Sequence, residues 1–105
     1  MPRQRICFLT AEISPFAKTG GLGDAVAGLA RSLHRRGADV RVFLPLYSSM
    51  DRSRIELHPV DFGRDVPVRS GPHDLRFSLL TTDLAPGGPA IHLIDCPGLY
   101  DRPSI

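Results

Sequence analysis

Residues 5–45 read RICFLTAEISPFAKTGGLGDAVAGLARSLHRRGADVRVFLP, and this stretch decides the fold. The short apolar run Ile6–Leu9 predicts a buried parallel strand, which we place at Arg5–Ala11. The β-branched run Val40–Leu44, closed by Pro45, predicts a second strand. Because a helical pattern lies between them, the stretch is expected to form a right-handed βαβ unit with parallel strands. The sequence therefore predicts an α/β protein whose ligand crevice lies at the carboxyl ends of the strands.

The helix of this unit is predicted over residues 22–36. Apolar side chains recur there at helical spacing, namely Leu22, Ala25, Val26, Leu29, Ala30 and Leu33. Gly37 supplies the stop signal at the carboxyl end. Asp24 in the first turn complements the positive end of the helix dipole. The cues at both ends therefore agree with the apolar pattern.

Beyond Tyr47 the pattern changes to short strands separated by Gly/Pro turns. These strands are predicted at Ile55–Phe62, Val66–Val68, Leu75–Thr82 and Ala90–Asp95. We interpret them as a β-hairpin or meander insertion. The last strand is the most apolar, and we expect it to rejoin the parallel sheet beside the first strand.

Length and charge restrict the function classes. The chain has 105 residues, enough for one compact domain, and its 13 Lys+Arg and 11 Asp+Glu leave a net charge of +2. Because the basic residues are scattered, binding to nucleic acid or to an anionic membrane is not expected. The apolar runs are too short for a membrane helix. Because the first residues lead directly into the first predicted strand, we expect no signal peptide.

Cysteines and histidines give no sign of a disulfide framework or a metal site. Cys7 and Cys96 lie far apart in apolar runs, where small buried hydrophobes are the usual interpretation, and a reducing cytoplasmic location fits them best. The four histidines lack ligand spacing: His34, His58, His73 and His92. We therefore expect no metal and no other cofactor.

The segment that carries chemistry is Lys18-Thr19-Gly20-Gly21-Leu22-Gly23-Asp24, between the first strand and the helix. Its glycines let a ligand approach the backbone closely, and the first N–H groups of a helix point outward unpaired. Lys18 is the only lysine of the chain. Because a compact cation beside a helix N-terminus favours phosphate, the segment predicts a site for a nucleotide diphosphate.

Two common phosphate motifs are excluded. The Walker pattern G-x-x-x-x-G-K-[ST] is absent because Lys18 precedes the glycines. The dinucleotide pattern G-x-G-x-x-G fails at Val26, and the end of the second strand, Phe43-Leu44-Pro45-Leu46, carries no acidic residue. These departures weaken the alternative of a nicotinamide-dependent oxidoreductase. On residue physics alone, a plain strand-to-helix turn with a solvated Lys18 stays open.

Residues 5–47 resemble the amino terminus of bacterial glycogen synthases and plant starch synthases. The resemblance rests on K-T-G-G-L-G-D after the strand end Thr10-Ala11-Glu12-Ile13-Ser14-Pro15, and it continues weakly through Asp95–Arg102. It implies a retaining glucosyltransferase of glycogen biosynthesis that moves glucose from ADP-glucose to the non-reducing end of an α-1,4-glucan. The implied fold is GT-B, with two Rossmann-like domains and the active site between them.

The same resemblance implies six substrate-binding residues: Glu12, Lys18, Thr19, Gly20, Gly21 and Asp24. Lys18 matches the family's donor-binding lysine, which faces the sugar-nucleotide phosphates, and the two glycines match those whose backbone meets the diphosphate. Glu12 matches a glutamate near the glucan and the donor sugar. For Asp24, the last motif position, we favour a helix-start role.

Residues 1–105 are then expected to be part of an amino-terminal domain, without the carboxyl-terminal domain, because members of that family are several times longer. We expect no catalytic residue within this part and no turnover by it alone, since the diphosphate would be held from one side only. The alternative is a non-catalytic nucleotide- or phosphate-binding module or remnant, which saturable nucleotide binding without transfer would favour.

Overall fold

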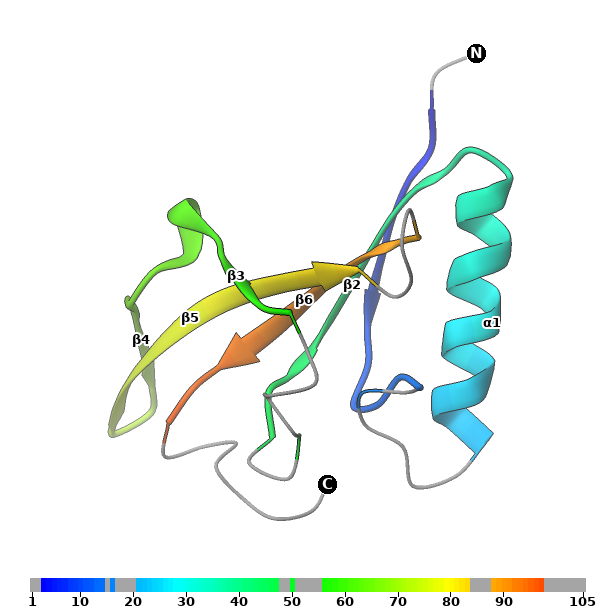
Figure 1. Ribbon diagram of the computed structural model, residues 1–105. Helices are drawn as coiled ribbons and strands as arrows, with labels where there is room; N and C mark the ends of the chain where they lie inside the picture. Colours follow the sequence, from blue (N-terminus) through cyan, green and yellow to red (C-terminus); the bar gives the residue numbers. More distant parts are fainter. Residues whose placement is uncertain are drawn as a thin grey trace.

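The computed structural model describes residues 3–14, 16, 21–47, 50, 56–83 and 88–97. Its first half is the predicted βαβ unit, formed by β1 (Arg5–Leu9), α1 (Gly21–Arg35) and β2 (Asp39–Pro45). β1 and β2 are parallel, and α1 lies against one face of the sheet (Figure 1). The α/β prediction is confirmed. The elements lie where the sequence predicts them, except that β1 ends before the predicted Ala11.

α1 ends in a capping motif built on Gly37. The Gly37 N–H donates to the His34 carbonyl oxygen at 3.0 Å, and the Ala38 N–H donates to the Leu33 carbonyl oxygen at 3.2 Å. Gly37 has a φ of +93°, a conformation that suits glycine and strains other residues. The two bonds are those of a Schellman motif. The stop signal predicted at Gly37 is therefore confirmed.

Only part of the predicted apolar stripe of α1 is buried. The buried positions carry small side chains or none: Gly23, Ala27 and Ala30. Leu22 and Leu29 are 55% and 51% exposed, so the prediction that they face the core is wrong. One helix on a sheet buries a narrow strip, and these two leucines lie outside that strip.

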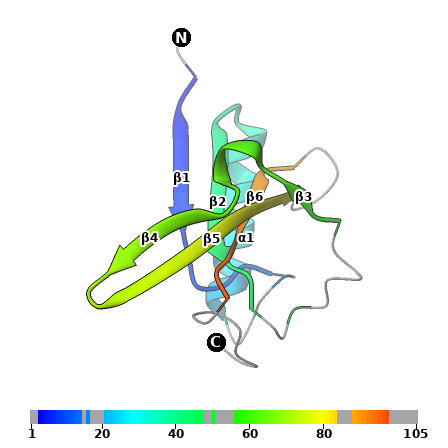
Figure 2. The ribbon, with the colours of Figure 1, turned by 90° about the vertical axis from the view of Figure 1, so that its left-hand side faces the viewer.

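In the second half of the chain, the strands pair with one another in antiparallel fashion. Its elements are β3 (His58–Pro59), the 3-10 helix η2 (Asp61–Gly63), β4 (Val66–Ser70), β5 (His73–Asp83) and β6 (Ala90–Asp95). β4 and β5 form the predicted hairpin around Gly71, whose φ is +59°, and this hairpin extends away from α1 (Figure 2).

The strand predicted over Ile55–Phe62 is wrong in extent. Ile55 lies outside the described residues, and the described remainder holds only the two-residue β3 followed by η2. Pro59 has no N–H to donate to a ladder, so β3 pairs briefly with β5 at the margin of the sheet. The chain then turns into η2.

β6 rejoins the parallel sheet as predicted, because it pairs in parallel with β2. The prediction that it lies beside β1 is wrong. The strand order is β1-β2-β6-β5-β3, with β4 paired to β5. On the face toward α1, Val42 of β2 is opposite Ile91 of β6, and both are fully buried. On the other face, the Phe43 ring stacks on the His92 ring with centroids 4.7 Å apart. Because consecutive parallel strands tend to be neighbours, β2 becomes a central strand and β1 lies at one end of the described order.

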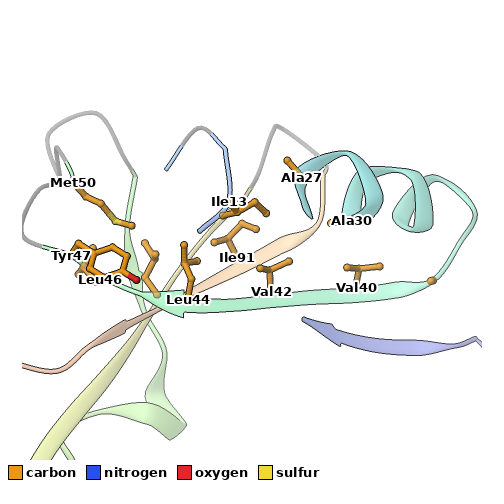
Figure 3. Packing of buried hydrophobic residues seen from close by; sticks show 12 residues of the cluster. Ile13, Ala27, Ala30, Val40, Val42, Leu44, Leu46, Tyr47, Met50 and Ile91 are labelled. Carbon is orange, nitrogen blue, oxygen red and sulfur yellow. The ribbon is translucent and has the colours of Figure 1, made fainter. Parts of the chain in front are cut away.

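The hydrophobic core lies between α1 and the sheet (Figure 3). β2 and β6 contribute Val40, Val42, Leu44, Ile91 and Leu93, all 2% exposed or less. The described residues place no α-helix on the opposite face. Leu9 is 81% exposed, and Cys7, predicted to be buried, is exposed as well. The prediction of a buried first strand is therefore wrong, because β1 alternates between exposed and half-buried residues.

Candidate functional site

The edge of the sheet at which a ligand crevice is predicted is formed by the end of β1 and the start of α1. β1 and β2 run in the same direction, so their carboxyl ends meet at one edge of the sheet, and α1 starts at that edge (Figure 1). Lys18, Thr19 and Gly20 lie outside the described residues. The residues that flank them, Ser14 and Gly21, are described, so the structure shows how both flanks of the predicted site are held.

Residues 10–14, which we call the junction segment, are tied to β2 and its extension. The Thr10 N–H donates to the Phe43 carbonyl oxygen at 3.1 Å. The Tyr47 hydroxyl donates to the Ala11 carbonyl oxygen at 3.0 Å. Ile13 is fully buried and points toward Ile91 and the helix (Figure 3). The junction segment is therefore fixed by two hydrogen bonds and one core side chain.

The junction segment also binds the first turn of α1. Glu12 is 4% exposed, and its Oε1 accepts a hydrogen bond of 2.9 Å from the Gly23 N–H. The Ser14 N–H donates to the Gly23 carbonyl oxygen at 3.1 Å. Both polar backbone groups of the third helical residue are thus satisfied by residues that follow β1.

The backbone around Glu12 is itself restrained. The Thr10 hydroxyl donates to the Glu12 carbonyl oxygen at 2.8 Å, and the Glu12 N–H donates back to the Thr10 hydroxyl oxygen at 3.3 Å. This short-range pair fixes the turn from which the Glu12 side chain reaches the helix. A negative carboxylate at a helix N-terminus is also favoured by the helix dipole.

This geometry changes the expectation for anion binding at the helix start. The first N–H groups of α1 were predicted to be unpaired, but the Gly23 N–H is already bonded to Glu12. Gly21 and Asp24 are exposed at the same turn, and a methyl group built on Gly21 would meet nothing within 4 Å. A ligand can therefore approach the backbone at Gly21, whereas the Gly23 amide is occupied by the protein's own carboxylate.

Sequence reasoning named Glu12 but missed its partner, and it missed Thr10 and Tyr47 altogether. The Glu12–Gly23 bond spans eleven residues, well beyond the three-residue spacing of a capping box. No local sequence pattern therefore predicts this bond. The Thr-x-Glu spacing offered a weak signal for the turn, because threonine hydroxyls bond backbone groups two residues away. Nothing local pointed to Tyr47.

His92 is a buried titratable group away from this edge. It is 7% exposed, and neither ring nitrogen has a hydrogen-bond partner among the described residues. Burial lowers the pKa of His92 below its ordinary 6.5, and the positive charge of Arg41 lowers it further. His92 is therefore held neutral as an aromatic packing group against Phe43.

The described residues contain neither a metal-ligand group nor a membrane-spanning helix. Within residues 3–14, 16, 21–47, 50, 56–83 and 88–97, histidine, cysteine and acidic side chains form no group of three that a metal ion would need. In the same residues, no helix has the length and apolar character to cross a membrane.

Comparison with known proteins now decides the family. The model of the starch synthase catalytic domain matches residues 5–105. The chain belongs to the starch synthase catalytic domain family. The glycogen synthases of Aeromonas hydrophila and Aromatoleum aromaticum are 35% and 39% identical to it, over 96% and 95% of this chain. Those matches cover 20% and 19% of the relatives, so the chain spans about one fifth of their length.

A solved member of the starch synthase family has the same fold. The catalytic domain of starch synthase IV from Arabidopsis thaliana superimposes with a TM-score of 0.83 and 28% sequence identity. The match covers 98% of this chain and 21% of that chain, which was solved bound to ADP and acarbose. The resemblance based on K-T-G-G-L-G-D is therefore confirmed, together with the α/β fold that it implied.

Proposed function

We propose that this chain forms the donor side of a retaining glycogen or starch synthase. The full-length protein would transfer glucose from ADP-glucose to the non-reducing end of an α-1,4-glucan in cytoplasmic glycogen biosynthesis. It would do so in a two-domain GT-B fold, without a metal or other cofactor. The observation that carries the proposal is the family match over residues 5–105. The ADP and acarbose bound to the starch synthase IV relative support a nucleotide and a glucan as ligands.

The proposed donor site is the segment between the junction segment and α1. Lys18 would bond the diphosphate through a charge-assisted contact, and Thr19 would lie in the same turn. Gly20 and Gly21 would present their backbone to the phosphates, since glycine allows close approach. Exposure and open space at Gly21 support that role. Glu12 and Asp24 flank this segment at the helix start.

This chain covers only part of the length of its relatives, and we propose that it therefore has only part of their activity. It spans about one fifth of its curated relatives, and residues 1–105 would be part of the amino-terminal domain. Transfer requires that the donor be oriented against the acceptor and that developing charge be stabilised. We propose that these tasks need the remaining family sequence, and that this chain by itself binds nucleotide without transferring glucose.

The test is glucose incorporation into glycogen by the full-length natural protein, with ADP-glucose and UDP-glucose as donors. Loss of the Lys18 bond in Lys18→Ala should raise the KM for the donor about 10- to 100-fold, as expected for a charge-assisted hydrogen bond. Arg31→Ala is the matched control, because Arg31 is an exposed cation on α1 and its loss should leave the donor KM unchanged. Absence of incorporation from both donors would refute the proposed function.

A further inference from the structure

We propose that Glu12 is a positioning residue of the donor site, which acts through the first turn of α1 instead of contacting the substrate. The inference rests on the proposed function and deepens it. Its basis is that Glu12 is 4% exposed and that its Oε1 already accepts the Gly23 N–H at 2.9 Å. One oxygen of this carboxylate is therefore already bonded to the protein's own helix.

The bond matters because of where its two ends lie. Glu12 belongs to the junction segment, which Thr10 and Tyr47 anchor to β2 and its extension. Gly23 lies in the first turn of α1, two residues after Gly21. Residues 15–20, which include Lys18, connect these two elements. Holding the elements at a fixed separation therefore fixes both ends of the proposed donor segment.

A second bond supports the same separation. The Ser14 N–H donates to the Gly23 carbonyl oxygen at 3.1 Å, so one glycine is held through its N–H and its carbonyl group. The Ser14 bond uses only backbone atoms and therefore does not depend on a side-chain group. Of the two bonds to Gly23, only the one from the Glu12 side chain can be removed directly by substituting a side chain.

Three substitutions separate hydrogen bonding from charge. Glu12→Gln keeps an oxygen acceptor at the same reach and loses the charge. Glu12→Asp keeps the charge, but its side chain is one methylene shorter and should lose or weaken the bond to the Gly23 N–H. Glu12→Ala loses both properties. A positioning role through the bond therefore predicts that the glutamine variant retains more activity than the aspartate or alanine variant, whereas a role through charge predicts that the aspartate variant retains more than the glutamine variant.

We expect the KM for the donor to change while the KM for the acceptor does not. In the full-length protein, Glu12→Ala should raise the KM for ADP-glucose about 3- to 30-fold, the range expected for loss of one helix cap. The KM for glycogen should stay unchanged. Glu56→Ala is the matched control, because the Glu56 side chain is 85% exposed and should leave both constants unchanged.

A structural readout accompanies the kinetics. Hydrogen exchange at the start of α1 should be faster in Glu12→Ala and Glu12→Asp than in the wild type, and near wild type in Glu12→Gln. If the alanine variant does not fold, comparing the activities of the glutamine and aspartate variants still distinguishes a role through the hydrogen bond from a role through charge. A rise in the glycogen KM with an unchanged donor KM, or unchanged exchange in Glu12→Ala and Glu12→Asp, would overturn the proposal. If the wild type transfers no glucose, the proposed function fails, and the exchange comparison still tests the cap.

Discussion

Replacing a glycine by alanine should have opposite effects on stability at two positions, one within α1 and one just after it. Gly28 lies inside α1 on its exposed side, and Gly37 forms the Schellman motif after it. A methyl group built on either glycine meets no atom within 4 Å. Steric clash therefore contributes nothing at either position, and only backbone conformation separates Gly28→Ala from Gly37→Ala.

The magnitudes follow from that conformation. Gly28 has helical geometry, so alanine there should raise the free energy of unfolding by about 0.5–1 kcal/mol. Gly37 has a φ of +93°, and an L-residue in a left-handed conformation is strained by about 1–2 kcal/mol. Alanine also restricts the unfolded chain, which offsets about 0.4–1 kcal/mol of this strain. Gly37→Ala should therefore lower the free energy of unfolding by about 1 kcal/mol.

The assay is urea unfolding followed by far-ultraviolet circular dichroism for the wild type and the two variants. The midpoint should rise for Gly28→Ala and fall for Gly37→Ala, while the dependence on urea concentration stays the same. The two variants add the same atoms to the same helix, so each is the control for the other. Equal midpoints, or a Gly37→Ala protein more stable than the wild type, would refute the reasoning from φ.

Two further predictions concern the sheet. The pKa of His92 is lowered by burial and by Arg41, so the folded protein binds its proton less readily than the unfolded chain, and stability should fall as pH decreases below 6.5. His92→Phe should make this decline shallower in unfolding measurements at several pH values, and an identical decline would contradict the assignment. An alanine methyl at Gly63 would lie 2.9 Å from Cγ of the buried Leu79, so Gly63→Ala should lower the free energy of unfolding by about 1–3 kcal/mol. The loss should shrink in a Leu79→Ala background, and an unchanged loss there would show that another contact is responsible.

The first half of the fold could be predicted because its signals are local. The apolar runs of β1 and β2 and the helical spacing between them lie in 41 consecutive residues. Gly37 marks the helix end through its own conformation, without help from distant residues. The exposure of Leu22 and Leu29 could not be predicted, because it depends on how wide a strip of helix the sheet covers.

The strand order in the second half depends on contacts between distant residues. A strand with the sequence of β6 fits beside β1 or beside β2 when judged by hydrophobicity alone. The choice is made by pairs such as Phe43 with His92 and Val42 with Ile91, which are about fifty residues apart in the sequence. β3 is a similar case, since the prediction of a longer strand ignored the missing N–H of Pro59.

For the site, the sequence identified the segment and the residue types, and the structure supplied their partners. The structure confirms the two elements that flank the glycine-rich segment, β1 and α1, and the family match confirms the resemblance built on that segment. The roles of Lys18, Thr19 and Gly20 stay predictions. The Glu12 cap could not be predicted, because sequence spacing alone did not show that its side chain turns toward the helix.

The Glu12 cap explains how α1 can begin with glycines beside the proposed donor site. Gly21 and Gly23 each disfavour the first turn of α1 by about 1 kcal/mol relative to alanine, a combined cost of about 2 kcal/mol. A cap contributes about 0.5–2 kcal/mol, and the Ser14–Gly23 bond contributes about 0.5–1.5 kcal/mol. The two bonds from the junction segment therefore offset the glycines. Because the stabilising groups come from the end of β1, the helix start can keep glycine at the exposed position where a phosphate would approach.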